Sequence, residues 1–577
     1  MLGRSTYRRW IVAFGCSALC HILSAQVVSL NGAGWTFRTA LGVAPHMISV
    51  PDCWPNHAEY RSYIGSAIYE RDFEVPAHPD GSVIRLHFDA VYARAHIWLN
   101  GRRVGNHDGG YTPFEFDVSK LLVPGANHLT VEVDNSFSLE TIPGLATAAS
   151  SDKTDAPGDA SKANIFGWWT YGGIPRDVTL KITAPLYIEN FKIEPTVNLA
   201  EQSVRIHTRF WLHNAGVTSA RVQATTTVAG ITGKSRVVTV APQQTVEVDL
   251  DASLLHAHLW SMSDPYLYHA SVVVPGDIAE SDFGVRDVRV RGTELLLNGK
   301  PVHAFGANRV SEDPQLGLIE TASVIERDLG DMLAANMRMM RIAHYPQSPA
   351  LLDYADRHGM LLIEEAGNWN LSGWQMEDSQ LRATWQSQMR EMIERDWNHP
   401  SIIAWSVGNE YESASAGGLA WTRDMRAFTL DTDATRLITF ASRFTFDTRV
   451  HSGDEESSRY SDFVSINMYG QYAAHLDRAH ALWPNKPIFV TEFGKMGEPG
   501  LHDPRRIADI QEAVSAIKSR PWAIGGSLWT WADYRSRRSD TPADGIRIWG
   551  VVTFDRQHRD SWNVVHDLFQ TDSTPSK

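Results

Sequence analysis

Short hydrophobic runs alternate with polar turns from residue 27 to residue 290. The runs are rich in β-branched and aromatic residues, as in Ser82–Phe88, Ala95–Leu99, Val204–Trp211 and Ser271–Val274. Short strands separated by turn residues at this spacing are typical of β-sandwiches. Because the pattern breaks near Ala184-Pro185, we predict a jelly-roll-like sandwich over residues 26–184 and an immunoglobulin-like sandwich over residues 185–290. Within the first sandwich, the polar residues 144–163 predict a long loop.

From about residue 300 the pattern changes, and apolar runs alternate with amphipathic segments of helical period. The predicted strands are His303–Asn308, Met339–His344, Leu361–Glu365, Ile402–Glu410, Leu437–Ala441, Phe463–Tyr469, Ile488–Phe493 and Ala523–Trp531. The clearest predicted helices are 322–336, 349–358, 380–396 and 504–518. Segment 442–462 is polar and irregular, and it predicts no helix. Eight strands with intervening helices indicate a (β/α)8 barrel over residues 291–577. Together with the two β-sandwiches before it, this barrel makes the predicted fold multidomain.

The first 25 residues have the pattern of a signal peptide. Arg4, Arg8 and Arg9 precede an apolar run, and Leu23-Ser24-Ala25 supplies small residues at a cleavage position. The run is too short for a membrane span. We therefore expect an exported protein, periplasmic or extracellular, that has no membrane segment after the signal is removed.

Composition narrows the function further. The chain has 577 residues, of which 43% are hydrophobic and 21% charged, as in ordinary soluble globular proteins. The formal net charge is −14, and loss of three N-terminal arginines would take it to −17, which argues against nucleic acid as a partner. Signal removal would leave Cys53 as the remaining cysteine, so no intrachain disulfide is expected. The 20 Trp residues suit either a large β-rich core or flat sugar faces.

Active sites of (β/α)8 barrels lie at the carboxyl ends of the strands, so polar residues there are candidates. The predicted strand ends carry Asn308-Arg309, Arg341, His344, Glu364-Glu365, Asn409-Glu410, Tyr469, Glu492 and Trp529. Glu410 and Glu492 each follow an apolar run. Two carboxylates across a sugar-sized opening can catalyse glycoside hydrolysis, one as nucleophile and the other as acid and then base. Alternatively, such carboxylates pair with arginine or bind a metal.

Three motifs carry a resemblance to a known family. The stretch Asp396–Glu410 reads Asp-Trp-Asn-His-Pro-Ser-Ile-Ile-Ala-Trp-Ser-Val-Gly-Asn-Glu, and it resembles the acid/base signature of glycoside hydrolase family 2. Arg341–Pro346, with Asp356–Gly359, resembles the second signature of that family. Thr491-Glu492-Phe493-Gly494 is similar to its nucleophile motif. The family contains β-galactosidases and β-glucuronidases, and its order of sandwich, immunoglobulin-like domain and barrel is the order predicted here.

The resemblance implies a retaining exo-β-glycosidase that removes terminal β-linked sugars from oligosaccharides or glycoconjugates by double displacement. The metal-ligand residues of the family's large galactosidases have no match in this chain, so we expect no cofactor and no metal. The implied catalytic residues are Glu410 as acid/base and Glu492 as nucleophile. Among the implied supporting residues, Asn409 hydrogen-bonds the 2-hydroxyl of the sugar, and Arg341 and Tyr469 hydrogen-bond the nucleophile. His344 and Trp529 form part of the pocket wall, and Glu365 either contacts the sugar or orders the site. Arg341 is expected to keep Glu492 ionised by lowering its pKa.

Two departures from the family concern the sugar. Uronide-specific members carry an Asn-x-Lys-Gly element, where this chain reads Arg547-Ile548-Trp549-Gly550. This difference favours a glycone other than a glucuronide. The nearby Arg535, Arg537, Arg538 and Arg547 are interpreted as a solvated loop, with binding of an acidic sugar as the alternative. Many members also place an aspartate where this chain has Gly167, so the usual contact to the far sugar hydroxyls is missing.

Two other classes of function compete with this interpretation. A non-catalytic carbohydrate-binding protein would keep the sandwich and the tryptophans, but it would not need Glu410 and Glu492 at strand ends. A metal-dependent barrel hydrolase would need clustered ligands, and His303 and His344 have no specific ligand spacing. The expected partner is therefore a carbohydrate. The sequence leaves the glycone open, and a homo-oligomer is compatible with it.

Overall fold

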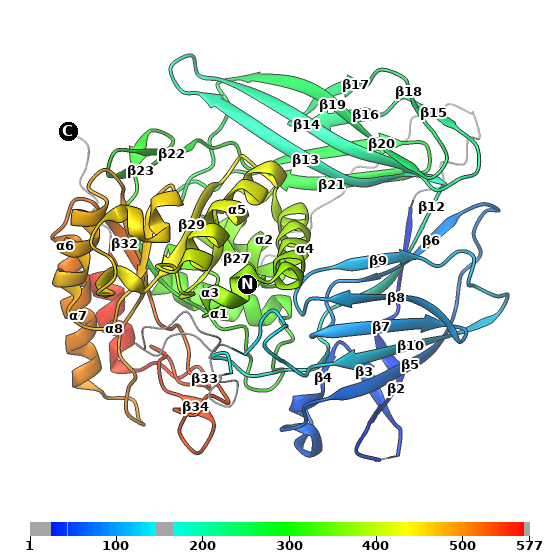
Figure 1. Ribbon diagram of the computed structural model, residues 1–577. Helices are drawn as coiled ribbons and strands as arrows, with labels where there is room; N and C mark the ends of the chain where they lie inside the picture. The colour runs from blue at the N-terminus through cyan, green and yellow to red at the C-terminus, as the bar shows by residue number, and fades with distance from the viewer. Residues whose placement is uncertain (1–24, 43, 146–164, 571–577) are drawn as a thin grey trace, which may run out of the picture.

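The computed structural model describes residues 25–42, 44–145 and 165–570. The predicted signal peptide, apart from Ala25, and most of the predicted loop 144–163 lie outside the described residues. Three units follow one another along the chain, with two β-sandwiches beside a barrel (Figure 1). In the described part of the chain, no helix combines the length and the apolar character needed to cross a membrane.

The first unit is an antiparallel sandwich. One sheet has the order β1 (Gln26–Ser29), β12 (Val178–Thr183), β6 (Val83–Phe88) and β9 (Phe114–Asp117). The other has the order β3 (His46–Val50), β2 (Gly32–Thr39), β5 (Ser66–Glu74), β10 (Ala126–Asp134), β7 (Arg94–Leu99) and β8 (Arg102–Asp108). Side chains alternate between buried and exposed along β10, as expected for a strand with one face on the core. The short strands β4 (Asp52–Cys53) and β11 (Gly173–Ile174) pair beside it.

The second unit is a smaller antiparallel sandwich. One sheet has the order β13 (Leu186–Asn198), β14 (Ser203–Asn214) and β19 (Gln244–Leu255). The other has the order β17 (Ile231–Lys234), β16 (Thr225–Val228), β20 (Tyr268–Val274) and β21 (Asp277–Phe283), with β15 (Ala220–Val222) and β18 (Val238–Val240) pairing alongside. The three-stranded meander β22 (Val288–Arg291), β23 (Glu294–Leu297) and β24 (Lys300–Pro301) leads into the barrel, where Leu295 and Leu297 join its apolar floor.

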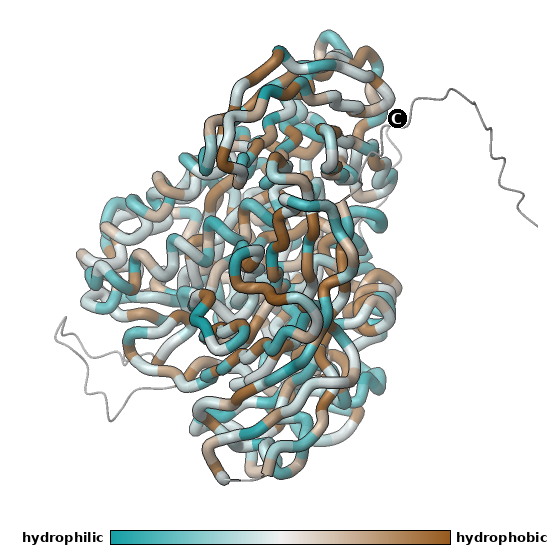
Figure 2. Tube along the Cα trace, turned by 90° about the vertical axis from the view of Figure 1, so that its right-hand side faces the viewer, coloured by the Kyte–Doolittle hydropathy of each residue, from teal (hydrophilic) through white to brown (hydrophobic). Residues whose placement is uncertain are grey.

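The third unit is an eight-stranded parallel barrel, which confirms the predicted fold class. Its sheet order is β25 (Ala304–Ala307), β32 (Ala523–Leu528), β31 (Ile488–Phe493), β30 (Val464–Asn467), β29 (Leu437–Ser442), β28 (Ile402–Asn409), β27 (Leu361–Glu365) and β26 (Met339–Arg341). The ladder is nearly closed, because the Arg338 amide donates to the Phe305 carbonyl at 2.7 Å across the last gap. Hydrophobic segments run through the interior, while hydrophilic ones are frequent along the outer turns (Figure 2).

Helices cover the outside of the barrel. They are α1 (Ala322–Ala334), α2 (Pro349–His358), α3 (Gly373–Glu377), α4 (Ser379–Asp396), α5 (Ala416–Thr432), α6 (Tyr472–Leu482), α7 (Pro504–Lys518) and α8 (Asp560–Leu568). Between β29 and β30, where no helix is predicted, the chain forms the 3-10 turns η4 (Phe444–Phe446), η5 (Gly453–Glu455) and η6 (Ser457–Tyr460). The barrel strands are buried on both faces, because helices cover the outer face and strand side chains fill the interior.

The start of the acid/base signature joins the barrel to the second sandwich. Trp397 Nε1 donates to the Phe191 carbonyl at 3.0 Å, and Asn398 Oδ1 accepts from the Ile193 amide at 2.9 Å. Beside them, the buried Lys192 ammonium lies 2.7 Å from Asp433 Oδ1. The first residues of the motif are therefore structural, while its last residues reach the barrel opening.

Candidate active site

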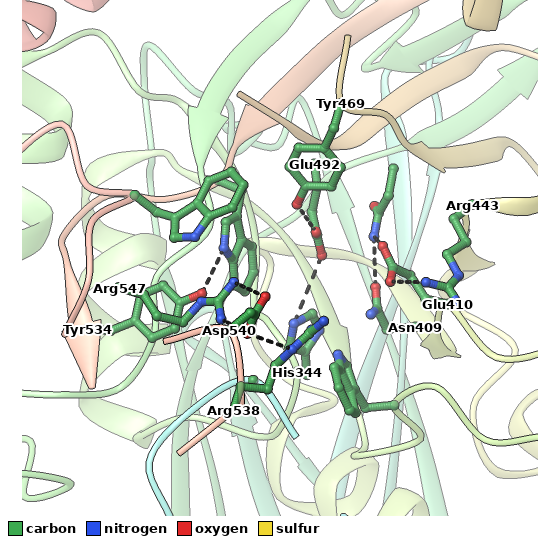
Figure 3. A pocket seen from close by; sticks show the side chains of 15 residues that line it. His344, Asn409, Glu410, Arg443, Tyr469, Glu492, Tyr534, Arg538, Asp540 and Arg547 are labelled. Carbon is green, nitrogen blue, oxygen red and sulfur yellow. Dashed lines mark hydrogen bonds and ion pairs between the residues drawn. The ribbon is translucent and has the colours of Figure 1, made fainter. Parts of the chain in front are cut away.

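A cavity of about 320 Å³ opens at the carboxyl ends of the barrel strands (Figure 3). Six of the predicted site residues line it: His344, Asn409, Glu410, Tyr469, Glu492 and Trp529. The other two, Arg341 and Glu365, are buried beneath it and contact the lining residues. The structure thus brings all eight predicted residues together, and Glu410 and Glu492 share one cavity.

Glu492 is the last residue but one of strand β31 and is 4% exposed. Its Oε1 accepts a hydrogen bond from Arg341 at 2.8 Å, and its Oε2 accepts one from the Tyr469 hydroxyl at 2.5 Å. The ring nitrogen Nε2 of His344 lies 3.9 Å from the same Oε1. Donors on both oxygens hold the carboxylate in one orientation, as a nucleophile requires.

The proton affinity of Glu492 differs from the prediction. Burial raises its pKa to about 7, and the neighbouring Glu410 adds to the rise, whereas Arg341 and Tyr469 act in the opposite direction. The predicted effect of Arg341 is present, but desolvation outweighs it, because a carboxylate that leaves water loses much of its solvation. Arg341 thus lowers the pKa of Glu492 as predicted, but the expectation that the net pKa is low is wrong.

Glu410 directly follows strand β28. Its backbone adopts a positive φ of 49°, which turns the side chain away from the strand direction and into the opening. Its Oε1 accepts a 2.9 Å hydrogen bond from Asn467 Nδ2. Its Oε2 lies 3.6 Å from the guanidinium of Arg443.

Asn409 has its amide orientation set by two donors. Its Oδ1 accepts from Arg341 at 2.6 Å and from Asn467 at 3.0 Å. Within the described residues, its Nδ2 has no protein partner, and the residue lines the cavity. An N–H donor is thus presented to whatever occupies the cavity, as the predicted contact to a sugar hydroxyl requires.

Glu365 orders the site from below and does not line the cavity. It binds Arg341 with both oxygens, at 2.8 and 3.2 Å, and accepts from the Ser406 hydroxyl at 2.8 Å. Burial tends to raise its pKa, but Arg341, His344 and Ser406 hold it below the usual value. Of the two roles predicted for Glu365, the contacts support the ordering role. Burial and Arg341 lower the pKa of His344, so its imidazole is neutral near pH 7.

Three tryptophans form the walls of the cavity. Trp529 stacks on His344, with ring centroids 5.1 Å apart, and its Nε1 donates to the Tyr534 hydroxyl at 3.0 Å. Trp369 and Trp549 line other parts of the wall. Flat apolar faces beside carboxylates suit a sugar ring, which has both C–H faces and hydroxyl edges.

The four arginines of the predicted solvated loop near the C-terminus have two different locations: Arg538 and Arg547 line the cavity, whereas Arg535 and Arg537 do not. Arg547 is 6% exposed and pairs with Asp540, and Arg538 Nε lies 3.2 Å from the same carboxylate; both arginines line the cavity. The interpretation as a solvated loop is therefore wrong for them. Arg535 instead lies 3.5 Å from Glu312, and Arg537 donates to backbone carbonyl groups of the first sandwich.

Other predicted strand-end residues serve the fold. Arg309 is buried against Asp328 at 2.9 Å and also pairs with Glu320. Asn308 Oδ1 accepts from Arg341 at 3.2 Å, below the cavity. Glu364 points away from the cavity toward Asp396, and burial raises its pKa well above the usual value.

Five lining residues were not identified from the sequence: Trp369, Arg443, Asn467, Tyr534 and Asp540. Asn467 ends strand β30, so the same strand-end argument that selected Asn409 was available for it. Arg443 and Asp540 lie in irregular segments, where periodicity carries no signal. Among the described residues, no cluster of three or more His, Cys, Asp or Glu side chains is arranged to hold a metal ion.

Comparisons with known proteins agree with this geometry. Residues 288–577 match the model "Glycosyl hydrolases family 2, TIM barrel domain". Residues 45–185 match the sugar binding domain of that family, and residues 186–286 match the model "Glycosyl hydrolases family 2". The chain belongs to glycoside hydrolase family 2. It is therefore a glycoside hydrolase, and the alternative of a non-catalytic carbohydrate-binding protein is set aside.

Several of the similar proteins are described as uronidases, and one similar structure is described as a "putative beta-galactosidase" from Bacteroides fragilis, with a TM-score of 0.82 at 24% identity, covering 95% of this chain and 86% of that one. The β-glucuronidase of Mus musculus is 26% identical over 548 residues, which cover 89% of this chain and 82% of that protein. A β-galacturonidase from Eisenbergiella tayi bound to galacturonate superposes with a TM-score of 0.84 at 24% identity, covering 94% and 97% of the two chains. Bifidobacterium dentium β-glucuronidase complexed with coumarin-3-O-glucuronide gives a TM-score of 0.82 at 25% identity, covering 95% and 97%. These relatives do not support the predicted preference against glucuronides.

Proposed function

We propose that this protein is a retaining exo-β-glycosidase that removes a terminal β-linked hexuronosyl residue, a glucuronosyl or galacturonosyl group. The observation that carries the proposal is the charge at one end of the cavity. Arg538 and Arg547 share the single carboxylate of Asp540 there. Among the described residues neither arginine has a second acidic partner, so one positive charge is left uncompensated, and one sugar carboxylate would balance it.

The proposed reaction has two steps. In the first, Glu492 attacks the anomeric carbon while Glu410 donates a proton to the departing oxygen, which yields a covalent glycosyl–enzyme and the free aglycone. In the second, Glu410 removes a proton from water as the water attacks that carbon, and Glu492 leaves. Two inversions at one carbon restore the original configuration.

Supporting residues bind and orient the reacting groups in this scheme. Arg341 and Tyr469 hold the two oxygens of Glu492, and Asn409 presents its amide nitrogen to the 2-hydroxyl of the sugar. A hydrogen bond to this hydroxyl strengthens as positive charge develops on the ring. Trp529 is held by its hydrogen bond to the Tyr534 hydroxyl, and its ring forms a flat wall for the sugar.

The burial of Arg547 favours an acidic glycone over a neutral one. A guanidinium that is 6% exposed has little access to water, so its donors need protein or ligand acceptors. Its carboxylate partner Asp540 has a side chain that is 51% exposed and is shared with Arg538. A neutral hexose would leave the excess charge without a partner, which costs binding free energy.

The proposal is tested with a panel of 4-nitrophenyl β-D-glycosides: glucuronide, galacturonide, glucoside and galactoside. We expect kcat/KM on one of the uronides to exceed both neutral hexosides by about tenfold or more, equal to about 1.4 kcal/mol of transition-state binding. Arg547→Gln should remove most of this preference. Arg537→Gln, in the same segment but outside the cavity lining, is the matched control and should keep it. A wild-type preference for a neutral hexoside would overturn the hexuronide assignment.

A further inference from the structure

A third arginine lines the cavity on the side away from the Arg538–Arg547 pair. Arg443 follows strand β29 and begins the irregular segment between β29 and β30. Figure 3 shows Arg443 beside Glu410, while Arg538 and Arg547 lie across the cavity, beyond His344 and Glu492. The cavity is therefore positively charged at both ends, with the two glutamates between them.

Arg443 is unusual in having few partners. Among the described residues, its nearest acidic group is Glu410, at 3.6 Å, which is too long for a hydrogen bond. The guanidinium also lies 5.4 Å from the centre of the Phe444 ring, and its side chain is one-third exposed. Its N–H donors are thus free to bind a ligand that enters the cavity.

The position of Glu410 identifies which part of a substrate Arg443 would meet. A general acid lies next to the oxygen of the leaving group, so the side of Glu410 farther from Glu492 is the aglycone side. When Glu410 carries the proton that it must donate, it is neutral. Arg443 then has no charged partner in the described structure, and an anion on the aglycone would supply one.

We propose that Arg443 determines aglycone specificity by binding an anionic group, a carboxylate or a sulfate, on the residue that follows the cleaved bond. The inference rests on the proposed role of Glu410 as acid/base. It deepens the proposed function, because the preferred substrates become oligosaccharides or conjugates that are acidic on both sides of the bond.

The same arrangement assists product release. Proton transfer from Glu410 to the departing oxygen leaves the glutamate negatively charged, 3.6 Å from the guanidinium of Arg443. The new carboxylate competes with the aglycone anion for the same cation, and it repels that anion. Arg443 thereby holds the anionic leaving group before the bond is cleaved and pairs with Glu410 afterwards.

The experiment compares aryl β-glycosides of one glycone that carry a carboxylate, a sulfate or an uncharged carboxamide on the aglycone. The measured quantity is the ratio of kcat/KM for each anionic aglycone to kcat/KM for the carboxamide. Differences in leaving-group reactivity cancel when this ratio is compared between variants. We expect Arg443→Gln to lower the ratio by about tenfold, the size expected for one charge-assisted hydrogen bond in a partly exposed site, and Arg443→Lys to keep part of it.

Arg459→Gln is the matched control. Arg459 lies in the same irregular segment, is 40% exposed and pairs with Asp454, outside the cavity lining. It removes one positive charge without touching the cavity, so the ratio should stay at the wild-type value. An equal loss on charged and uncharged aglycones in Arg443→Gln would show that Arg443 acts through Glu410 alone and would overturn the proposal. An unchanged ratio in a folded variant would do the same.

The ratio is measured on whichever glycone the enzyme hydrolyses best. A neutral glycone would therefore reject the hexuronide assignment without affecting the test of Arg443. If the carboxylate and the sulfate aglycone respond differently to Arg443→Gln, the larger response identifies which anion the site prefers.

Discussion

Arg341 donates a 2.8 Å hydrogen bond to Oε1 of Glu492 from beneath the floor of the cavity. The same guanidinium donates to Asn409 Oδ1 and to Glu365. One buried cation thus fixes the proposed nucleophile and the amide proposed to contact the 2-hydroxyl. Its charge is compensated from below by Glu365, so Glu492 does not have to stay ionised to satisfy Arg341.

The first prediction concerns pH. The pKa of Glu492 is raised to about 7, and the attacking form is the ionised one, so kcat/KM should fall as pH drops below about 7. Tyr469→Phe removes a hydrogen bond to the ionised form, which raises the pKa further and moves the acidic limb to higher pH. The measurement is kcat/KM against pH on a substrate with no titrating group. A limb that stays in place or moves down in Tyr469→Phe contradicts this account.

The second prediction separates the two carboxylates. Glu492→Ala should lose turnover by about 10⁴-fold or more, because no covalent intermediate forms. Added azide should enter the space left by the side chain and yield a glycosyl azide of inverted configuration. In Glu410→Ala, azide should instead attack the covalent intermediate and yield the retained configuration. Product configuration is read by NMR, and the swapped result would reverse the two roles.

The third prediction concerns Asn467, which holds Oε1 of Glu410 at 2.9 Å. Asn467→Ala should let the acid lose its orientation. The loss of kcat/KM should be about 10²-fold for substrates with poor leaving groups, which depend on proton donation. A 2,4-dinitrophenyl glycoside, whose leaving group needs little protonation, should lose much less. An equal loss on both substrates would mean that Asn467 acts on sugar binding and not on Glu410.

The fourth prediction concerns stability. Lys192 in the second sandwich and Asp433 in the barrel form a buried pair at 2.7 Å. Burial tends to raise the pKa of Asp433, but Arg436 and Lys192 hold it well below the usual value. Lys192→Met should lower the free energy of unfolding by about 3 kcal/mol, because a buried carboxylate loses a partner.

Urea unfolding measures this effect, and the double variant Lys192→Met with Asp433→Asn should recover part of the loss. Arg205→Gln, which breaks an exposed pair with Asp251, should change stability little. Because the folded pKa of Asp433 is depressed, its contribution is present above the pKa of the unfolded chain and declines as pH falls toward the folded pKa. A Lys192→Met effect that grows as pH falls from 7 to 4 would contradict this direction.

Barrel strands were predicted best where they are apolar on both faces. Leu361–Glu365 and Ile488–Phe493 have the predicted bounds, because both faces are buried and the runs are continuous. The strand predicted as Ala523–Trp531 ends at Leu528. Trp529 and Trp531 continue the apolar run, but their side chains serve the cavity wall and the core after the ladder has ended. Hydrophobicity alone does not distinguish a strand residue from an apolar residue that follows the strand.

The site was predictable where motif and strand end coincide, as at Glu410 and Glu492. It was not predictable for Arg443 or Asp540, since their positions depend on how irregular segments pack against distant elements. The pKa of Glu492 was mispredicted for a related reason. The sequence identifies Arg341 as its partner, but the degree of burial that opposes Arg341 is a property of the assembled cavity.

Of the described residues in the first sandwich, Gly167 is the one that lines the cavity. Among the described residues, the nearest atom to a Cβ at this position would be a ring carbon of Trp369, at 4.0 Å. At this position the described part of the sandwich therefore contributes backbone and no side chain, and the proposed catalytic groups all come from the barrel. New side chains at residue 167 can reach the substrate without displacing any of those groups. Residue 167 is thus a position where a substitution is expected to change sugar preference while leaving the proposed catalytic groups in place.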